Sequence, residues 1–366
     1  MSPDLVVILT GALVALAGGS LGAFLLLRRS TMQVDAISHS VLPGIVAAFW
    51  LSGGSYATLP ALLGAATFGL ITVYAVEALT RSGRVKEEAA IGMVFPALFS
   101  IGVLAITRFF GNVHLDLDAV LYGEIAFAPF NELEAFGLNL GPESLWLMGA
   151  VAAVNLAFIA TFFKELKLTT FDPGLAGSLG FSPGLLQTVL MTLVSITTVA
   201  AFQSVGAKLI LGLVVIPTAT AYLLTDNLKT LLLGGAALGI AVAAAGYGAA
   251  LWLDLSVAGA MVSVAGLAFL VAFLASPRYG LVAGLLRLTR QRRGVDARHL
   301  LRHLGHLGAG APLAEIAGAL EWPVSRAARA AWIATRRGWL ERGGGRIRLT
   351  ATGRALAEHP EGGPLG

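Results

Sequence analysis

The sequence predicts an all-α polytopic membrane protein with about eight to nine transmembrane helices, followed by a small soluble α+β domain. Of its 366 residues, 56% are hydrophobic and only 13% are charged, which a water-soluble globular protein could not accommodate on its surface. Apolar runs of roughly 20 residues recur, each long enough to cross about 30 Å of hydrocarbon. Charge then divides the chain: residues 1–276 contain 10 Lys and Arg against 15 Asp and Glu (−5), and residues 277–366 contain 15 against 6 (+9).

Nine apolar runs are predicted to be membrane spans. They cover residues 5–27, 31–52, 57–79, 89–109, 144–163, 184–203, 206–224, 230–252 and 255–275. If spans alternate in direction, most of the cations of residues 1–276 fall on one side, and positive residues mark the cytoplasm. We therefore expect a multi-pass protein of a bacterial inner membrane, with its N-terminus outside and its C-terminal domain in the cytoplasm. The first run follows no basic segment, so it is not expected to be a cleaved signal peptide.

Two titratable side chains interrupt the second run. Asp35 and His39 lie one helical turn apart, so their Cβ atoms would be about 5–6 Å apart on one face. A charge at bilayer depth costs about 2.5–3.5 kcal/mol on insertion scales, which needs an offset. A carboxylate oxygen and an imidazole nitrogen could together bind a cation, with the hydroxyls of Ser38 and Ser40 nearby. The alternative is a neutral histidine hydrogen-bonded to Asp35.

A second acidic group lies in the external connection, residues 111–143. In an extended segment, His114, Asp116 and Asp118 would share one side, because side chains alternate with period two. Glu124 follows. Such a patch could gather divalent cations at the external mouth, or it could be a solvated acidic loop.

The cytoplasmic connection, residues 164–183, is predicted to form a single short helix. Asp172 suits the N-cap, Pro173 the first helical position and Gly180 the C-terminal stop. Phe171, Leu175, Leu179 and neighbouring residues would then form a docking element for a partner, although an ordinary interfacial helix has the same pattern.

The sequence also excludes several kinds of chemistry. Cysteine is absent, so a metal site must use His, Asp, Glu or backbone oxygens, and no thiolate is available. The chain has no glycine-rich P-loop for ATP phosphates. Transport would need either an ion gradient or a separate ATPase, and the predicted docking helix favours the ATPase.

Four segments, in order, resemble the ABC-3 family of zinc, manganese and iron importer permeases. They are residues 26–44 (LLRRSTMQVDAISHSVLPG), 88–92 (EAAIG), 112–125 (NVHLDLDAVLYGEI) and 216–221 (IPTATA). The third is similar to the manganese-type branch. The resemblance covers roughly residues 5–275 and implies a type II ABC importer-like permease.

The resemblance implies particular partners and particular site residues. The permease would pair with a second permease subunit, as homodimer or heterodimer, and two cytoplasmic ABC ATPase subunits would dock around residues 171–180. An extracytoplasmic metal-binding protein would deliver the metal. Asp35 and His39 become pathway ligands, with His114, Asp116, Asp118 and Glu124 as further candidates.

The expected cargo is a divalent metal, and no permanently bound cofactor is expected. Oxygen-rich ligands and the manganese-like segment favour manganese over zinc or iron, although ligand type alone does not settle selectivity. The alternatives are a gradient-driven metal transporter and a membrane-tethered metal-responsive regulator.

The tail departs from the usual family pattern, which ends soon after the last span. After a basic linker, residues 277–294, residues 295–360 resemble a winged helix-turn-helix domain of bacterial metalloregulators. Its arginines could face DNA phosphate or a protein partner: Arg326, Arg329, Arg336, Arg346 and Arg348. A basic segment beside a membrane also suits anionic lipid. His299, His303 and His306 share a helical face and could sense metal or simply be surface histidines.

Overall fold

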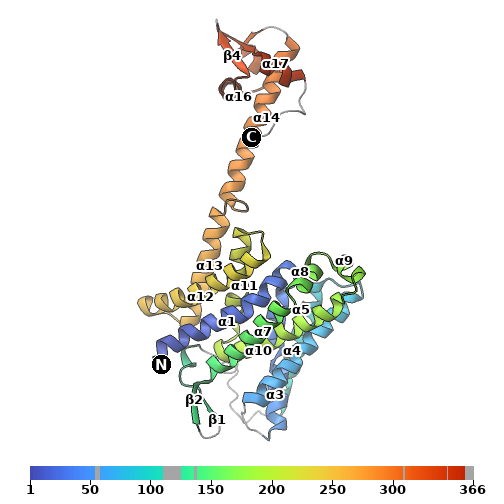
Figure 1. Cartoon of the computed structure of the whole chain (residues 1–366), viewed down its shortest axis with the longest axis vertical. Helices are drawn as coiled ribbons and strands as arrows, with labels where there is room; N and C mark the ends of the chain where they lie inside the picture. The colour runs from blue at the N-terminus through green and yellow to red at the C-terminus, as the bar shows by residue number, and fades with distance from the viewer. Residues whose placement is uncertain (54–57, 110–124, 136–137, 308–309, 344, 359–366) are drawn as a thin grey trace. The chain divides into compact units, whose positions relative to one another are not determined.

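The computed structural model describes residues 1–53, 58–109, 125–135, 138–307, 310–343 and 345–358 (Figure 1). The chain forms two compact units, residues 1–273 and 274–366. The first holds the apolar helices, and the second holds the basic tail.

All nine predicted runs are helical. The helices are α1 (Pro3–Leu27), α2 (Met32–Ser40), α3 (Leu42–Leu51), α4 (Thr58–Arg81), α5 (Glu87–Phe109), α7 (Glu143–Thr161), α10 (Pro183–Val205), α11 (Ala207–Leu224), α12 (Leu228–Leu253) and α13 (Val257–Ala275). Eight stretches within the described residues are long and apolar enough to cross a membrane, counting α2 and α3 as one, and Leu209–Leu224 of α11 is a shorter apolar helix. The expectation of eight to nine spans is confirmed.

Helix α1 is the centre of the first unit. Its hydrophobic residues lie on all sides, as expected of a helix enclosed by others, and it packs against α7, α10, α11 and α12 (Figure 1). Polar side chains hold these neighbours in register: Asn155 Nδ2 of α7 donates to the Ala17 carbonyl at 3.2 Å and to Thr197 Oγ1 of α10 at 2.8 Å. Such interhelical hydrogen bonds help helices to associate in lipid, where the hydrophobic effect does not favour association between helices.

The second predicted run is divided at Val41 into α2 and α3. Two close backbone approaches follow this break. A Cβ on Gly44 of α3 would lie 2.2 Å from the carbonyl oxygen of Gly64 on α4, and a Cβ on Gly102 of α5 would lie 2.8 Å from the Pro43 nitrogen. These small residues let α4 and α5 pack closely on α3, directly after α2, which carries Asp35 and His39.

Replacing Gly44 with alanine is expected to destabilise the protein by about 1–3 kcal/mol, because the added methyl group meets backbone rather than a movable side chain. Thermal unfolding of the purified chain in detergent measures the effect. Gly92→Ala is the matched control, since a Cβ there has no neighbour within 4 Å. Equal shifts for the two variants would contradict the close-packing argument.

The two long connections lie at opposite ends of α7. On the side predicted to be external, a short 3-10 helix (η1, Ile125–Phe127) precedes an antiparallel hairpin of β1 (Glu132–Ala135) and β2 (Leu138–Pro142), which the sequence analysis did not predict. On the other side, α8 (Phe163–Phe171) and α9 (Pro173–Ser178) connect α7 to α10. The predicted short helix is α9, but the sequence did not predict α8, which ends where Asp172 leaves helical geometry.

The second unit contains the predicted helix pair and hairpin. Its elements are α14 (Leu281–Leu307), β3 (Ala311–Pro312), α15 (Leu313–Ala319), α16 (Val324–Arg336), β4 (Leu340–Gly343), β5 (Arg346–Leu349) and α17 (Ala351–Glu358). The sheet has the order β3-β5-β4 and is antiparallel. A separate core joins α14 and α16 through Leu300, Leu301, Ala330 and Ala331. Helix α14 begins at Leu281, so residues 281–294 of the predicted linker are helical.

Candidate functional site

Asp35 and His39 lie together on α2, as their spacing predicts. His39 Nε2 is 3.4 Å from Asp35 Oδ1, beyond the usual hydrogen-bond range of 2.7–3.2 Å. At ligand distances of about 2.1 Å, atoms this far apart would subtend roughly 110° at one cation, so both could bind it without moving. The His39 ring also lies 5.7 Å from that of Phe95 on α5. The two atoms are therefore spaced so that one cation could contact both, and they make only a weak contact with each other.

The pair lies on the uncovered face of α2. The side chains of Asp35 and His39 are 33% and 43% exposed, whereas Val34, Ile37 and Ser38 are fully buried. The buried side packs against α4, α5 and α10. The face that carries Asp35 and His39 is thus left partly uncovered by the described residues.

Ser38 and Ser40 do not join the pair. Ser38 Oγ donates to the Val34 carbonyl at 2.9 Å, and Ser40 Oγ donates to the Ile37 carbonyl at 3.1 Å and contacts Thr72 Oγ1 at 2.5 Å. Both serines are fully buried, so the expectation that their hydroxyls add to a cation site was wrong. Their helical positions turn them toward the packed side of α2.

The four candidate residues of the external connection lie outside the described residues: His114, Asp116, Asp118 and Glu124. Within the described ranges, no three His, Cys, Asp or Glu side chains come together in a group able to hold a metal. This applies also to His299, His303 and His306, whose predicted sensor site is therefore not formed by described residues.

Helix α9 is capped as its sequence predicts. Asp172 Oδ1 accepts a hydrogen bond from the Leu175 amide at 2.9 Å, and Pro173 occupies the first helical position. Gly180 ends the helix with φ +87°, a conformation that glycine adopts at little cost. The Phe181 amide then donates to the Ala176 carbonyl at 3.1 Å. A helix of only six residues is thereby held at both ends.

The outer face of this segment is apolar. Phe171, Leu175 and Leu179 are 60%, 47% and 60% exposed. Phe171 ends α8, Leu175 lies on α9 and Leu179 follows α9, so the three exposed apolar side chains flank one short capped helix. Such an exposed apolar surface suits a protein partner.

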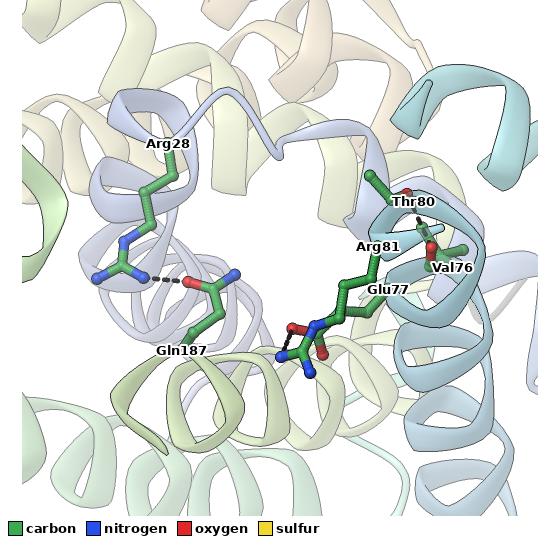
Figure 2. A network of polar contacts seen from close by, with 6 residues as sticks. All are labelled: Arg28, Val76, Glu77, Thr80, Arg81 and Gln187. Atoms are coloured by element: carbon green, nitrogen blue, oxygen red, sulfur yellow. Dashed lines mark hydrogen bonds and ion pairs between the residues drawn. The ribbon is translucent and has the colours of Figure 1, made fainter. Parts of the chain in front are cut away.

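Arg28 ties α1 to this connection, which the sequence analysis did not foresee because it used the residue only as a marker of the cytoplasmic side. Its guanidinium donates to Thr169 Oγ1 at 3.0 Å and Thr170 Oγ1 at 3.1 Å, both on α8, and to Gln187 Oε1 on α10. Figure 2 shows Arg28 reaching Gln187 across from the Arg81–Glu77 pair of α4. Burial lowers the pKa of Arg28 below its usual range.

The arginines of the second unit have different surroundings. Arg326 forms a two-pronged ion pair with Asp296, at 2.6 and 3.0 Å, and lies 4.4 Å from the Trp322 ring. The Asp296 hydrogen bonds raise the pKa of Arg326. Arg326 thus has an acidic partner within the domain. All five candidate arginines are exposed: Arg326, Arg329, Arg336, Arg346 and Arg348.

Comparison with known proteins agrees with this arrangement. The chain is 42% identical to the manganese transport system membrane protein MntD of Bacillus subtilis, over 80% of this chain and 99% of the relative. It is 43% identical to the zinc transport system membrane protein TroD of Treponema pallidum, over 96% and 97%. The solved structure of PsaBC from Streptococcus pneumoniae in complex with Fab matches with a TM-score of 0.62 and 26% identity, covering 76% of this chain and 94% of that one.

The family model of the ABC 3 transport family matches residues 5–276, the whole apolar unit. The match to TroD extends through the tail, so the second unit is shared with at least one relative. The chain therefore belongs to the ABC 3 transport family, as a membrane-spanning transport subunit and not as an enzyme.

Proposed function

We propose that the chain is the permease subunit of an ATP-driven importer of divalent metal, with manganese as the preferred cargo. The observation that carries the proposal is the Asp35–His39 pair, two metal ligands on the uncovered face of a helix inside a family of transport permeases. Oxygen and imidazole ligands suit Mn²⁺ and also Zn²⁺ and Fe²⁺. The names of the relatives mention manganese, zinc and iron, so relatedness supports the metal class more strongly than the individual metal.

Two ligands from the chain fit a transit site better than a storage site. An ion must bind well enough to lose its water but weakly enough to leave. A permanent site would supply a closed set of ligands, as structural zinc sites do with four. Water and a second permease subunit on the uncovered face of α2 would complete the coordination of the ion.

The partners follow from the same assignment. Two ATPase subunits would dock on the exposed apolar face of Phe171, Leu175 and Leu179, and an extracytoplasmic binding protein would deliver metal at the opposite side. The N-terminus would be external and the second unit cytoplasmic, in a bacterial inner membrane. The exposed arginines of the second unit would contact a partner protein or nucleic acid, and the match of TroD along the tail favours a role within the transport system.

Reconstitution tests the proposal. The purified chain alone in liposomes is expected to show no ATP hydrolysis and no metal uptake, because it lacks a P-loop. Adding its ATPase subunit and binding protein should give ATP-dependent uptake, measured with Mn²⁺, Zn²⁺ and Fe²⁺ by elemental analysis, with Mn²⁺ accumulating fastest. Uptake by the chain alone, driven by an ion gradient, would contradict the proposal and favour a secondary transporter.

A further inference from the structure

The connection between α1 and α2 is short and fixed by hydrogen bonds. Arg28 caps the end of α1, and the Ser30 amide donates to the Leu25 carbonyl at 2.9 Å. The Gln33 amide donates to the Ser30 carbonyl at 3.2 Å as α2 begins. Only seven positions along the chain separate Arg28 from Asp35. A displacement of the Arg28 side chain would therefore shift the start of α2.

The same side chain holds the segment that would meet an ATPase. Thr169 and Thr170 are near the end of α8, and Asp172, which follows directly, caps α9. Gln187 lies on the first turns of α10, beyond α9. Arg28 thus forms hydrogen bonds with the chain on both sides of α9, and Figure 2 shows the bond to Gln187 of α10. We call the three hydrogen bonds from Arg28 to Thr169, Thr170 and Gln187 the Arg28 grip.

The grip is chemically unusual. All three acceptors are neutral, and Arg28 forms no ion pair with a carboxylate of the described residues. Removing a cation from water without a counter-charge is costly, and apolar packing would join two helices more cheaply. The planar fork of arginine can nevertheless reach three acceptors in fixed directions, which a lysine point charge cannot do. This geometry favours a positioning role over a purely stabilising one.

We infer that Arg28 is a positioning residue that transmits movement of α8 and α9 to α2, and so couples ATP hydrolysis by the partner to the Asp35–His39 pair. The inference rests on the proposed function, since it requires an ATPase docked at α9. The route runs from α9 through Asp172 to Thr169 and Thr170, then through Arg28 to the connection that starts α2. Without the grip, the ATPase would still dock and hydrolyse ATP, but α2 would follow its movement poorly.

The experiment measures metal transported per ATP hydrolysed, with the full chain, its ATPase and its binding protein in liposomes loaded with a Mn²⁺ indicator. Arg28→Gln removes the charge, and Arg28→Lys keeps the charge but loses the fork. Both are expected to lower the transport-to-hydrolysis ratio by about tenfold, while ATPase co-purification is unchanged. Arg29→Gln is the control, because Arg29 is exposed and its side chain forms no hydrogen bond or ion pair with the described residues.

The acceptors give a second, independent variant. Thr169→Val combined with Thr170→Val keeps side-chain shape and should lower the ratio in the same direction. Adding Arg28→Gln to this pair should cause little further loss, because residues in one network are not additive. Thr192→Val is the control, since that hydroxyl bonds only the Thr188 carbonyl of its own helix.

Different results would overturn the inference about Arg28 and the proposed function. A normal transport-to-hydrolysis ratio in folded Arg28→Gln, or loss of ATPase binding instead of coupling, would overturn the inference. A fall that is fully additive with the threonine variants would also oppose it. Failure of the wild-type chain to transport metal with ATP would instead overturn the proposed function, and this is read before any variant is tested.

Discussion

Asp35→Asn is expected to reduce ATP-dependent metal uptake by about 100-fold or more, with ATPase docking intact. The substitution keeps the side-chain shape but replaces a carboxylate with an amide, a much weaker ligand for Mn²⁺, and losing even supporting groups of a metal site costs about 10–100-fold. Uptake is measured by elemental analysis in a deletion strain and in liposomes. His39→Ala should have a smaller effect on Mn²⁺ than on Zn²⁺, which binds imidazole more strongly.

Thermal stability distinguishes metal binding by Asp35 from a purely structural role of the Asp35–His39 pair. If the pair only held α2 in place, Asp35→Asn would destabilise the protein. The separation of 3.4 Å between His39 Nε2 and Asp35 Oδ1 is too long for a strong hydrogen bond, and a charge in a span costs about 2.5–3.5 kcal/mol on insertion scales. We therefore expect thermal stability to be unchanged or raised while uptake is lost. Ser38→Ala is the control on the same helix, because its hydroxyl bonds the Val34 carbonyl and faces the packed side. A variant that loses uptake and stability together would contradict metal binding by Asp35.

Helix spacing and terminal chemistry explain which parts of the site the sequence could predict. The i, i+4 positions of Asp35 and His39 required only helical periodicity, and the cap of α9 required only the local preferences of Asp172, Pro173 and Gly180. Both features depend on a few adjacent residues. The nine apolar runs were predictable for a similar reason, because the thickness of the bilayer sets their length.

Two features that the sequence did not predict are contacts between distant segments. Nothing near Arg28 in the sequence indicates Thr169 or Gln187, which lie more than 140 positions away. The sequence also did not indicate that Asp296 from α14 would pair with Arg326 of α16. Ser38 and Ser40 were placed near the cation because they are neighbours in sequence, whereas helical rotation turns them into the packed side. Local patterns predict elements well, and partners across the fold need the tertiary arrangement.

Introducing acidic side chains on α9 is expected to abolish transport by a different route. Leu175→Glu with Leu179→Glu places two carboxylates on the exposed apolar face that we assign to ATPase docking. Burying a charge without a counter-charge against a partner is costly, and truncation at a hot spot commonly costs 2 kcal/mol or more, roughly 30-fold in affinity. Titration of the ATPase against the purified variant in detergent should show at least that weakening, and uptake should fall with it.

The fold of the permease should survive this change, because both leucines point outward and the Asp172 cap uses the Leu175 amide, not its side chain. Leu307→Glu is the matched control, as that leucine is 44% exposed on the second unit. The pattern also differs from that of Arg28. Charge on α9 removes ATPase binding and hydrolysis together, whereas loss of the Arg28 grip leaves both and reduces only the metal moved per ATP. Normal ATPase affinity in the doubly substituted α9 would show that the partner docks elsewhere, and the route from α9 to α2 would then lose its starting point.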